Sequence, residues 1–394
     1  MTPAARVSAA IEVLDQILAG LPAERALAAW GRGNRYAGSK DRAALRDLVF
    51  DALRRKRSYA ALGGAETGRG LMIGALRHKA APVEDVFSGA RFAPAPLSAE
   101  EARAGGAAQD PAAALDCPDW LFPLICDALG DLAEPVLDSL RDRAPVALRV
   151  HLGRTTRDAA QAALLADGIE TATHPLSPSA LHVTGGARRI RASAAFATGD
   201  VELQDAASQA VADMVPLPEG GRMLDYCAGG GGKTLAVGAR VRGQFWAHDV
   251  DLGRMVDLPV RASRAGLAVT CIDTAALAGA APFDVVLVDA PCSGSGSWRR
   301  DPQGKWALTP DRLAALRDTQ AAILDQAAQL VAEGGHLVYM TCSLLDQENS
   351  AQISDFLRRM PAWRQVQARA LTPLDGGDGF FFSALTRSSP LNNL

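Results

Sequence analysis

The apolar residues of the first eighty positions recur every three or four residues, which is the spacing of one face of a helix. Two sets show this spacing, Ala9, Ile11, Val13, Leu14, Ile17 and Leu18 in the first and Leu45, Leu48, Val49, Ala52 and Leu53 in the second. Gly20 is suited to end the first helix, and Ser39, followed by Asp41, to begin the second. The basic run Arg54–Arg57 would close that second helix. We therefore predict an all-helical domain over residues 1–80.

The pattern changes after this segment. Residues 81–115 are rich in proline, glycine and small residues, which predicts a linker. Residues 116–200 mix the two periods and predict a small α+β domain. Its expected helices are Trp120–Leu129 and Thr156–Ala166, and its expected strands are Val146–Val150 and Leu181–Val183. Six arginines here could contact RNA, although exposed arginines are ordinary on any surface: Arg149, Arg154, Arg157, Arg188, Arg189 and Arg191.

Over residues 201–387 short apolar runs alternate with helical patterns, which predicts an α/β domain with a doubly wound, Rossmann-like parallel sheet. The expected strands are Arg222–Asp225, Gln244–His248, Ala268–Ile272, Val285–Val288 and His336–Met340. The expected helices between them are Lys233–Val241, Arg254–Ala265 and Pro310–Ala332. Asp378–Phe382 predicts a final hairpin, and Arg387–Leu394 has no evident structure.

Charge is distributed unevenly along the chain. The net charge is −3, but residues 1–80 hold fourteen Lys and Arg against seven Asp and Glu. The basic segment could face a polyanion or could be a well-solvated helical surface, and charge alone leaves both readings open. The side chains that could form a phosphate-facing surface are Arg32, Arg35, Lys40, Arg42, Arg46 and the run Arg54–Arg57.

Cysteine usage and hydropathy indicate the compartment. The six cysteines include no C-x-x-C pair, which argues for a reducing compartment and against a zinc site. Glu12 and Asp15 interrupt the first apolar run, and no stretch of about 18 apolar residues occurs elsewhere. We expect a cytoplasmic monomer that binds neither a membrane nor a metal.

Two cysteines follow predicted strands directly. The apolar run Val285–Val288 stops at Asp289, and Cys292 comes three residues later in a segment rich in glycine and serine. A second strand, which begins at Gly335, leads to Cys342. Ligands of open α/β sheets bind at the carboxyl ends of the strands. We therefore predict that the two thiols and the carboxylate of Asp289 face one site.

A glycine-rich turn follows the first strand of the same domain. It ends in Gly-Lys-Thr like a P-loop, but Cys227 stands where that motif needs glycine, so the match fails. Asp249 lies 20 residues after Gly229, the interval at which an acidic residue holds ribose hydroxyls, and Asp273 ends the next strand. A nicotinamide nucleotide or S-adenosylmethionine (SAM) would fit. The expected cofactor-binding residues are Cys227, Ala228, Gly229, Gly230, Gly231, Gly232, Lys233, Asp249, Asp273 and Asp289.

The thiols favour SAM, because hydride transfer needs no cysteine whereas methylation of carbon 5 of a pyrimidine does. A thiolate that adds to carbon 6 makes carbon 5 nucleophilic enough to attack a methyl sulfonium. A base then removes the proton from carbon 5 and the thiol leaves. Asp289 could hold the polar edge of the ring, and Lys233 is a candidate cation that favours the thiolate.

At these motifs the chain resembles the Sun-type (RsmB-like) RNA cytosine carbon-5 methyltransferases, over roughly residues 116–385. The segments that carry the resemblance are Cys227–Thr234, Asp249–Met255, Asp273, Asp289–Gly294 and Thr341–Ser343, with support from Gln204–Gln209, Arg300–Trp306, Gln347–Asn349 and Gly379–Phe380. The helices around Arg35–Arg42 resemble, less specifically, a NusB-like RNA-binding domain.

The resemblance implies roles for these residues. Cys342 would be the nucleophile and Cys292 would assist product release, while the glycine turn and the three strand-end aspartates would bind SAM. Such turns usually carry proline where this chain has Gly230. The substrate would be a cytosine of RNA extruded into the site, with 16S rRNA favoured by analogy and the small α+β domain acting as an RRM-like RNA-binding subdomain. A tRNA substrate, or a non-catalytic RNA-binding ribosome assembly factor, are the alternatives.

The remaining cysteines and tryptophans have simpler interpretations. Cysteine is among the most buried residue types, so we expect Cys117, Cys126 and Cys271 in the core and Cys227 packed beside the cofactor turn. Trp298 and Trp306 could stack on bases or pack in the core, and the sequence does not separate these two roles.

Overall fold

The computed structural model of the 394-residue chain describes residues 1–387. Contacts between Cα atoms divide the chain into two compact units. The first consists of residues 1–143 together with residues 298–308, and the second of residues 144–297 together with the chain from residue 309 onward. The chain therefore leaves the second unit at residue 298 and returns to it at residue 309.

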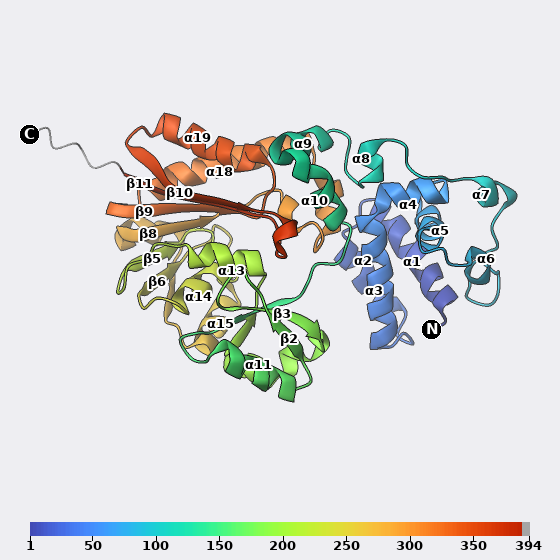
Figure 1. Cartoon of the computed structure of the whole chain (residues 1–394), viewed down its shortest axis with the longest axis horizontal. Helices are drawn as coiled ribbons and strands as arrows, with labels where there is room; N and C mark the ends of the chain where they lie inside the picture. The colour runs from blue at the N-terminus through green and yellow to red at the C-terminus, as the bar shows by residue number, and fades with distance from the viewer. Residues whose placement is uncertain (388–394) are drawn as a thin grey trace, which may run out of the picture. The chain divides into compact units, whose positions relative to one another are not determined.

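The first unit is helical, which confirms the prediction for residues 1–80 (Figure 1). Its first five helices are α1 Pro3–Leu18, α2 Ala23–Gly33, α3 Ser39–Arg54, α4 Lys56–Gly63 and α5 Gly68–His78. Thr2 caps α1 by accepting a hydrogen bond from the backbone of Ala5. Gly38, rather than Ser39, precedes α3, and it makes no side-chain cap. The likeness to NusB remains a prediction.

The segment predicted as a linker is held against these helices. It carries three short helices, α6 Val83–Val86, α7 Ala99–Arg103 and α8 Pro111–Ala114. Arg69 pairs with Glu101 of α7 at 2.6 Å, and Arg77 donates to the carbonyls of Glu101 and Ala104. Helices α9 Phe122–Leu129 and α10 Ala133–Ser139 complete the N-terminal part of this unit.

Residues 298–308, which include α17 Pro302–Ala307, pack within this helical unit. Arg54 donates to the carbonyl of Arg299 at 2.7 Å, and the indole of Trp306 donates to the carbonyl of Leu53 at 2.7 Å. Trp298 is buried, which is the core role. Trp306 is half-buried, and its ring is contacted by the ammonium groups of Lys56 and Lys305. Burial lowers the pKa of Lys305 to about 8, although the Asp116 carboxylate opposes that shift.

The second unit begins with a small antiparallel sheet. Its strands are β1 Ala147–Val150, β2 Glu170–Thr173, β3 Ala180–Gly185 and β4 Val201–Leu203, in the order β2-β3-β1-β4. Helix α11 Arg157–Ala166 packs its Leu164 against Leu148 and Leu181 of this sheet. An α+β arrangement is found from residue 144 onward, whereas residues 116–143 of the segment predicted for it, with helix α9, belong to the helical unit. Strands β2 and β4 were not predicted.

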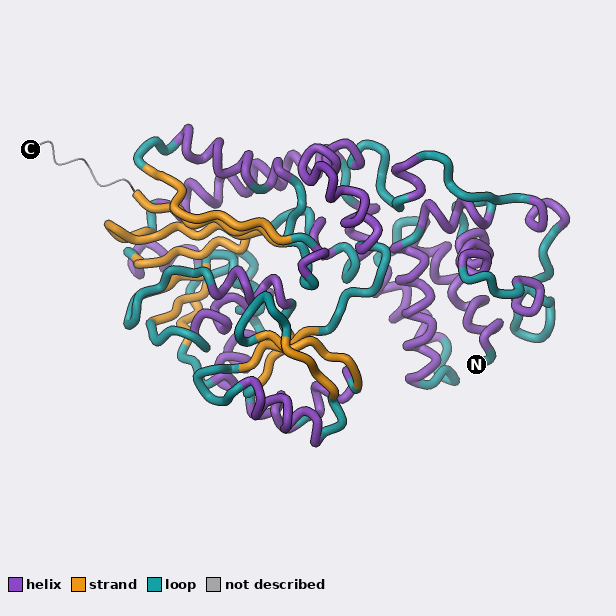
Figure 2. The backbone as a smooth tube through the Cα atoms, in the orientation of Figure 1, coloured by secondary structure: helices purple, strands orange, loops and turns teal. Residues whose placement is uncertain are grey.

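The large sheet has seven strands in the order β10-β11-β9-β8-β5-β6-β7. Figure 2 draws the strands of both sheets in orange. They are β5 Arg222–Asp225, β6 Gln244–Ala247, β7 Val269–Cys271, β8 Phe283–Asp289, β9 Val331–Thr341, β10 Trp363–Leu371 and β11 Phe380–Arg387. Strands β5 to β9 pair in parallel, while β10 and β11 are antiparallel to their neighbours. The predicted Rossmann-like sheet and final hairpin are thereby confirmed. Residues 388–394 of the predicted structureless end lie outside the described residues.

Helices cover both faces of this sheet. Helices α13 Ala206–Asp213, α14 Gly232–Gly238 and α15 Leu258–Ala265 cover one face, and α16 Leu277–Ala280, α18 Pro310–Ala328 and α19 Ser350–Arg359 the other. Strand β8 is buried on both faces of the sheet. Val285 and Leu287 pack in the core on the side of α13 and α14, and Val286 and Val288 in the core on the side of α18 and α19. This two-sided burial explains why a central strand reads as a continuous apolar run.

The strand order reverses at β5, which lies between β8 and β6. In doubly wound sheets the crevice beside such a reversal is the usual ligand site. No helix within residues 1–387 is long and apolar enough to span a bilayer. The same residues contain no cluster of three or more His, Cys, Asp or Glu side chains arranged to hold a metal ion.

Candidate active site

Two neighbouring parallel strands bring the predicted thiols together. Strand β8 ends at Asp289 and β9 ends at Thr341, so Cys292 and Cys342 leave the same edge of the sheet. The turn after β8 is bound to β9 and its continuation by backbone hydrogen bonds from Ala290 to Met340 and from Gly296 to Cys342, both at 2.9 Å. The two Sγ atoms lie 3.5 Å apart.

A buried carboxylate that the sequence analysis did not single out joins the two cysteine turns. Glu348 is fully buried and accepts hydrogen bonds from the backbone and hydroxyl of Ser293, which follows Cys292. It also accepts from the hydroxyl of Ser343, which follows Cys342, and from the amide of Gln320. One carboxylate therefore fixes the residues next to both thiols.

Asn349 fixes the same region from its other side. Its side-chain oxygen accepts from the Thr341 hydroxyl, and its amide nitrogen donates to the carbonyl of Ser343 at 2.9 Å. Tyr339 of strand β9 donates to the carbonyl of Glu348 at 2.7 Å. The sequence signal for this network was the run Gln347–Asn349, which supported the resemblance without suggesting a role.

The surroundings of the two thiols favour different protonation states. A hydrogen bond from Cys292 lowers the pKa of Cys342, and the charge of Lys233 and the hydroxyl of Ser297 add to that effect against burial and the charge of Asp289. The same hydrogen bond, burial and the negative charge of Glu348 raise the pKa of Cys292. Thiolate is the nucleophilic form, and these surroundings favour it at Cys342 and disfavour it at Cys292.

Lys233 and Asp289 form an ion pair beside the thiols. Lys233 lies in the first turn of α14, and its Nζ is 3.0 Å from Oδ2 of Asp289. The ammonium is buried and lies 4.4 Å from the ring centroid of Phe380, whereas about one third of the Asp289 side chain is exposed. The pair therefore presents a fixed carboxylate at the end of β8.

The glycine turn between β5 and α14 needs at least one of its glycines. Gly231 has φ +75°, and a Cβ there would lie 2.1 Å from a methyl carbon of Leu258. The backbone N–H of Gly229 donates to Asp249 at 3.1 Å, and Arg254 pairs with the same oxygen at 3.2 Å. Asp273 is exposed at the end of β7 and caps the following turn. Asp289 thus ends β8, and Asp249 and Asp273 lie two residues beyond the ends of β6 and β7, at the same edge of the sheet.

Side chains from outside the turn hold its carbonyl groups. Arg261 of α15 donates to the carbonyl of Gly230, and a Cβ on Gly230 would lie 2.8 Å from the Arg261 Nη1. Arg149 of β1 and Gln204 both donate to the carbonyl of Gly232 at 3.1 Å. The arginine therefore fills the space beside the glycine that replaces proline.

Asp225, at the end of β5, lies under this turn and was not predicted to matter. It is fully buried and accepts a hydrogen bond from the hydroxyl of Thr234 at 2.6 Å. Burial, reinforced by the charge of Asp289, raises the pKa of Asp225 to about 7. Its protonation state therefore changes near neutral pH, between the turn and the Lys233–Asp289 pair.

The other cysteines follow the prediction in part. Cys117 is buried, and Cys227 is half-buried next to the turn, with a pKa raised by burial. Cys126 is half-buried. Cys271 is exposed, which contradicts the core position expected for it, because the edge strand β7 leaves this position uncovered.

Comparison with known proteins gives family matches over two segments of the chain. Residues 213–385 match the family described as 16S rRNA methyltransferase RsmB/F. Residues 117–188 match the ferredoxin-like domain of RsmF/B-like methyltransferases, which is the segment predicted as the RRM-like subdomain.

Curated relatives carry the same description. The chain is 35% identical over 285 residues to ribosomal RNA small subunit methyltransferase B of Klebsiella pneumoniae (strain 342), and 34% identical over 283 residues to that of Vibrio cholerae serotype O1. Each alignment covers 68% of this chain, and it spans 66% and 65% of the lengths of those relatives, just under two thirds.

Solved structures share the fold. The crystal structure of PH0851 matches with a TM-score of 0.75 at 22% identity and covers 98% of this chain and 99% of its own. The structure titled NSun6 from Pyrococcus horikoshii with SFG matches with a TM-score of 0.62 at 17% identity and covers 69% of this chain and 99% of its own.

Proposed function

We propose that the chain is a member of the RsmB/F family of 16S rRNA methyltransferases and that it transfers a methyl group from SAM to carbon 5 of a cytosine in RNA, with 16S rRNA as the substrate. The observation that carries this proposal is the 3.5 Å separation of the Cys292 and Cys342 sulfurs at the carboxyl edge of the sheet. Methylation at carbon 5 of a pyrimidine needs such a nucleophile, whereas methylation of an exocyclic nitrogen does not.

The residues around the glycine turn suit SAM. The turn offers backbone donors at the start of α14, and Asp249, Asp273 and Asp289 lie at or just beyond the ends of the three strands beside it. SAM supplies the electrophilic methyl group when it is bound. Arg261, Arg149 and Gln204 hold the carbonyls of the turn, so the backbone donors are oriented before the cofactor arrives.

The reaction begins with nucleophilic addition to the base. The Cys342 thiolate forms a bond from Sγ to carbon 6 of the cytosine, and electron density moves to carbon 5. Asp289, whose position is fixed by Lys233, accepts a hydrogen bond from the polar edge of the ring and favours the protonated ring nitrogen. Carbon 5 then takes the methyl group.

Release requires the loss of a proton and of the thiolate. The proton leaves carbon 5, the double bond between carbons 5 and 6 forms again, and the bond from carbon 6 to Cys342 breaks. Cys292 is held beside this bond by Ser293 and Glu348. We assign Cys292 to this second step: water accepts the proton of carbon 5, and the Cys292 thiol donates a hydrogen bond to the Cys342 sulfur as that sulfur leaves as a thiolate.

The test is transfer of labelled methyl from SAM to 16S rRNA by the purified chain, followed by bisulfite mapping of the labelled position. Label in a single cytosine is the expected result. Label only in tRNA would change the substrate, and binding of rRNA without any transfer would identify an assembly factor instead. This substrate also places the proposed site of action in the cytoplasm, where we expect the chain to act as a monomer.

A further inference from the structure

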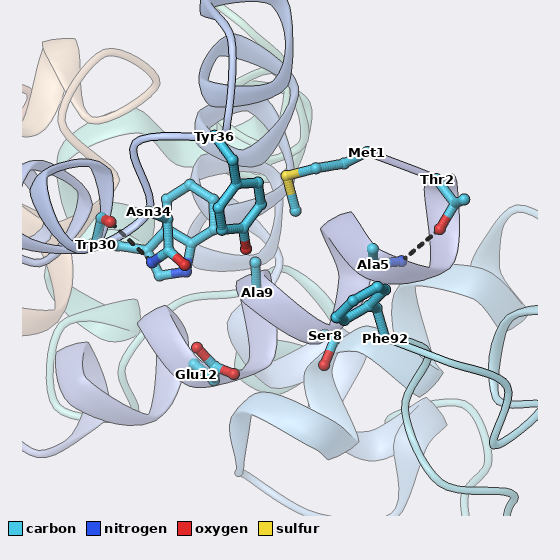
Figure 3. Close-up of a pocket in the computed structure, with 10 residues that line it drawn as sticks. All are labelled: Met1, Thr2, Ala5, Ser8, Ala9, Glu12, Trp30, Asn34, Tyr36 and Phe92. Atoms are coloured by element: carbon cyan, nitrogen blue, oxygen red, sulfur yellow. Dashed lines mark hydrogen bonds between the residues drawn. The ribbon is translucent and has the colours of Figure 1, made fainter.

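The helical unit contains a hollow that the proposed reaction does not use. It has a volume of about 480 Å³ and is lined by helix α1, the end of α2 and the segment around Phe92 (Figure 3). Trp30 and Tyr36 lie on one side of it and Phe92 on the other, with Ala5 and Ala9 of α1 between them. Its lining is therefore mainly apolar and aromatic.

Two of these aromatic rings are exposed to an unusual degree. Tyr36 is 74% exposed and Phe92 69% exposed, and they are the two aromatic residues among the exposed large hydrophobic residues of the described chain. Phe92 also adopts φ +68°, a conformation that is costly for a residue with a bulky side chain. Both rings line the same hollow, so their exposure is concentrated at one place.

Four exposed cations of residues 1–80 have no acidic or backbone partner. Within residues 1–80 most Lys and Arg side chains are neutralised or bonded to the backbone, as in the pairs Lys56–Glu66 and Lys79–Asp51. This corrects the predicted phosphate-facing surface, because Arg54 is buried. Four other members of that surface form ion pairs: Arg46 with Glu24, Arg55 with Asp142, Lys56 with Glu66 and Arg57 with Asp119. The exposed cations of this segment with no acidic or backbone partner are Arg25, Arg32, Arg35 and Lys40.

Three of those four cations flank the aromatic hollow in sequence. Arg32 and Arg35 lie on either side of Asn34, which lines the hollow, and Lys40 begins the helix that follows Tyr36. On the opposite side Arg91 is exposed and stacks over the ring of Phe92 at 4.8 Å. Unpaired positive charge and exposed aromatic rings therefore occur in the same two segments.

We propose that this hollow binds an unpaired nucleobase of RNA between Tyr36 and Phe92, while the neighbouring cations contact the adjoining phosphates. Single-stranded nucleic acids are bound by this combination of stacking rings and positive charge. Asn34 and Glu12 place an amide and a carboxylate at the wall of the hollow, where they can bond to the edge of a base. A base stacked within a duplex could not enter it.

The inference rests on the proposed function in that it takes RNA as the substrate, but binding can be measured apart from methyl transfer. The full chain would be titrated against a 12-nucleotide single-stranded RNA and against the same sequence in a duplex. The variant Tyr36→Ala/Phe92→Asn removes both rings, and asparagine tolerates the backbone conformation of Phe92. We expect its affinity for the single strand to fall about ten- to hundred-fold, with little change for the duplex.

Two further variants separate stacking from folding and from charge. Leu132→Ala removes another exposed apolar side chain of the same unit, 48% exposed and outside the hollow, and should bind both RNAs as the wild type does. Arg32→Ala/Arg35→Ala should weaken binding of the single strand and reduce its dependence on salt. Far-ultraviolet circular dichroism of each variant should match the wild type, because the substituted side chains are exposed.

Unchanged binding of the single strand by Tyr36→Ala/Phe92→Asn would overturn the inference, as would an equal loss for Leu132→Ala. Photocrosslinks from the RNA to Tyr36 or Phe92 in the wild-type chain would support it. Failure of the wild type to methylate any RNA would instead refute the proposed function and leave the binding result standing.

Discussion

The Sγ atom of Cys292 lies 3.5 Å from the Sγ atom of Cys342, although fifty positions separate the two residues in sequence. Their proximity follows from the parallel pairing of β8 with β9 and from the backbone hydrogen bond between Gly296 and Cys342. Their environments differ, because Lys233 acts on the pKa of Cys342 and Glu348 on that of Cys292, and this difference supports the separate tasks that we propose for them.

Substitution of each thiol should therefore give a different phenotype. Cys342→Ala should abolish methyl transfer and prevent any covalent adduct with RNA. Cys292→Ala should retain adduct formation but slow its breakdown, so that a protein–RNA complex accumulates. Denaturing gels with end-labelled RNA would measure both. Accumulation of the adduct in Cys342→Ala would exchange the two roles.

Lys233→Met should move the pH dependence of the reaction. The charge of Lys233 lowers the pKa of Cys342, so its removal raises that pKa and shifts the acidic limb of the kcat/KM profile to higher pH. At pH 7 we expect a loss of about ten-fold or more, which is partly recovered in alkaline buffer. Lys233→Arg keeps the charge and should shift the limb less. A loss that is equal at every pH would contradict this account.

Glu348→Ala should reduce both stability and activity. It removes the acceptor shared by Ser293, Ser343 and Gln320 and leaves buried donors without a partner. We expect the free energy of unfolding to fall by about 3 kcal/mol, measured by urea denaturation. Asp346→Ala, an exposed carboxylate two residues away, is the matched control and should change stability little. Equal effects of the two substitutions would show that Glu348 does not hold the turns.

Asp225 should make stability depend on pH. Its pKa is raised from 3.8 to about 7 in the folded chain, so between those values the native state binds more protons than the unfolded state. Its contribution to stability is therefore present below pH 3.8, falls as the pH rises to 7, and is constant above that. The full change is about 4 kcal/mol at most.

Asp225→Asn should remove this contribution to the pH dependence of the unfolding free energy. Urea unfolding at pH 5 and pH 8 would measure it, and the difference in unfolding free energy between these pH values should be smaller in the variant than in the wild type. An unchanged difference would mean that Asp225 is ionised throughout that range.

Arg261→Ala should weaken SAM binding about ten-fold, because the carbonyl of Gly230 loses its donor and the turn gains freedom. Gly230→Ala should be harmful in the wild type, where its Cβ would meet Arg261 at 2.8 Å, and less harmful in Arg261→Ala. Calorimetry across this double-mutant cycle would measure the coupling. Arg264→Ala, which loses only a contact to Glu202 on the neighbouring strand and one to Phe196, serves as the control. Additive effects of the two substitutions would show that Arg261 does not act on SAM binding through Gly230.

The predicted parts of the fold were those with a local signal. Strand β8 is buried on both faces and so reads as an unbroken apolar run. The strands that were not predicted lack that signal: β2 is largely exposed, and β10 exposes the residues between Trp363 and Leu371 because it is an edge strand. Helix α2 was missed although it is amphipathic, because the residues that it buries are Ala23, Ala26 and Trp30, and alanine is a weak apolar signal in a sequence.

The residues of the site likewise divide into those with a local sequence signal and those without one. The thiols and the strand-end aspartates were predictable because each follows a strand directly. Glu348, Asp225 and Arg261 were not, because burial of a carboxylate and the reach of an arginine to a distant carbonyl depend on long-range packing. The inclusion of residues 298–308 in the helical unit likewise has no local signature.

That inclusion affects how the chain can fold as it is made. Domains generally fold from the N-terminus as synthesis proceeds, at about 5–20 residues per second. The helical unit cannot take up Lys305 and Trp306 until the ribosome has passed them, roughly 8–30 s after it has passed Arg143. The N-terminal helices are therefore synthesised well before a segment of their own unit, which is encoded some 160 codons downstream.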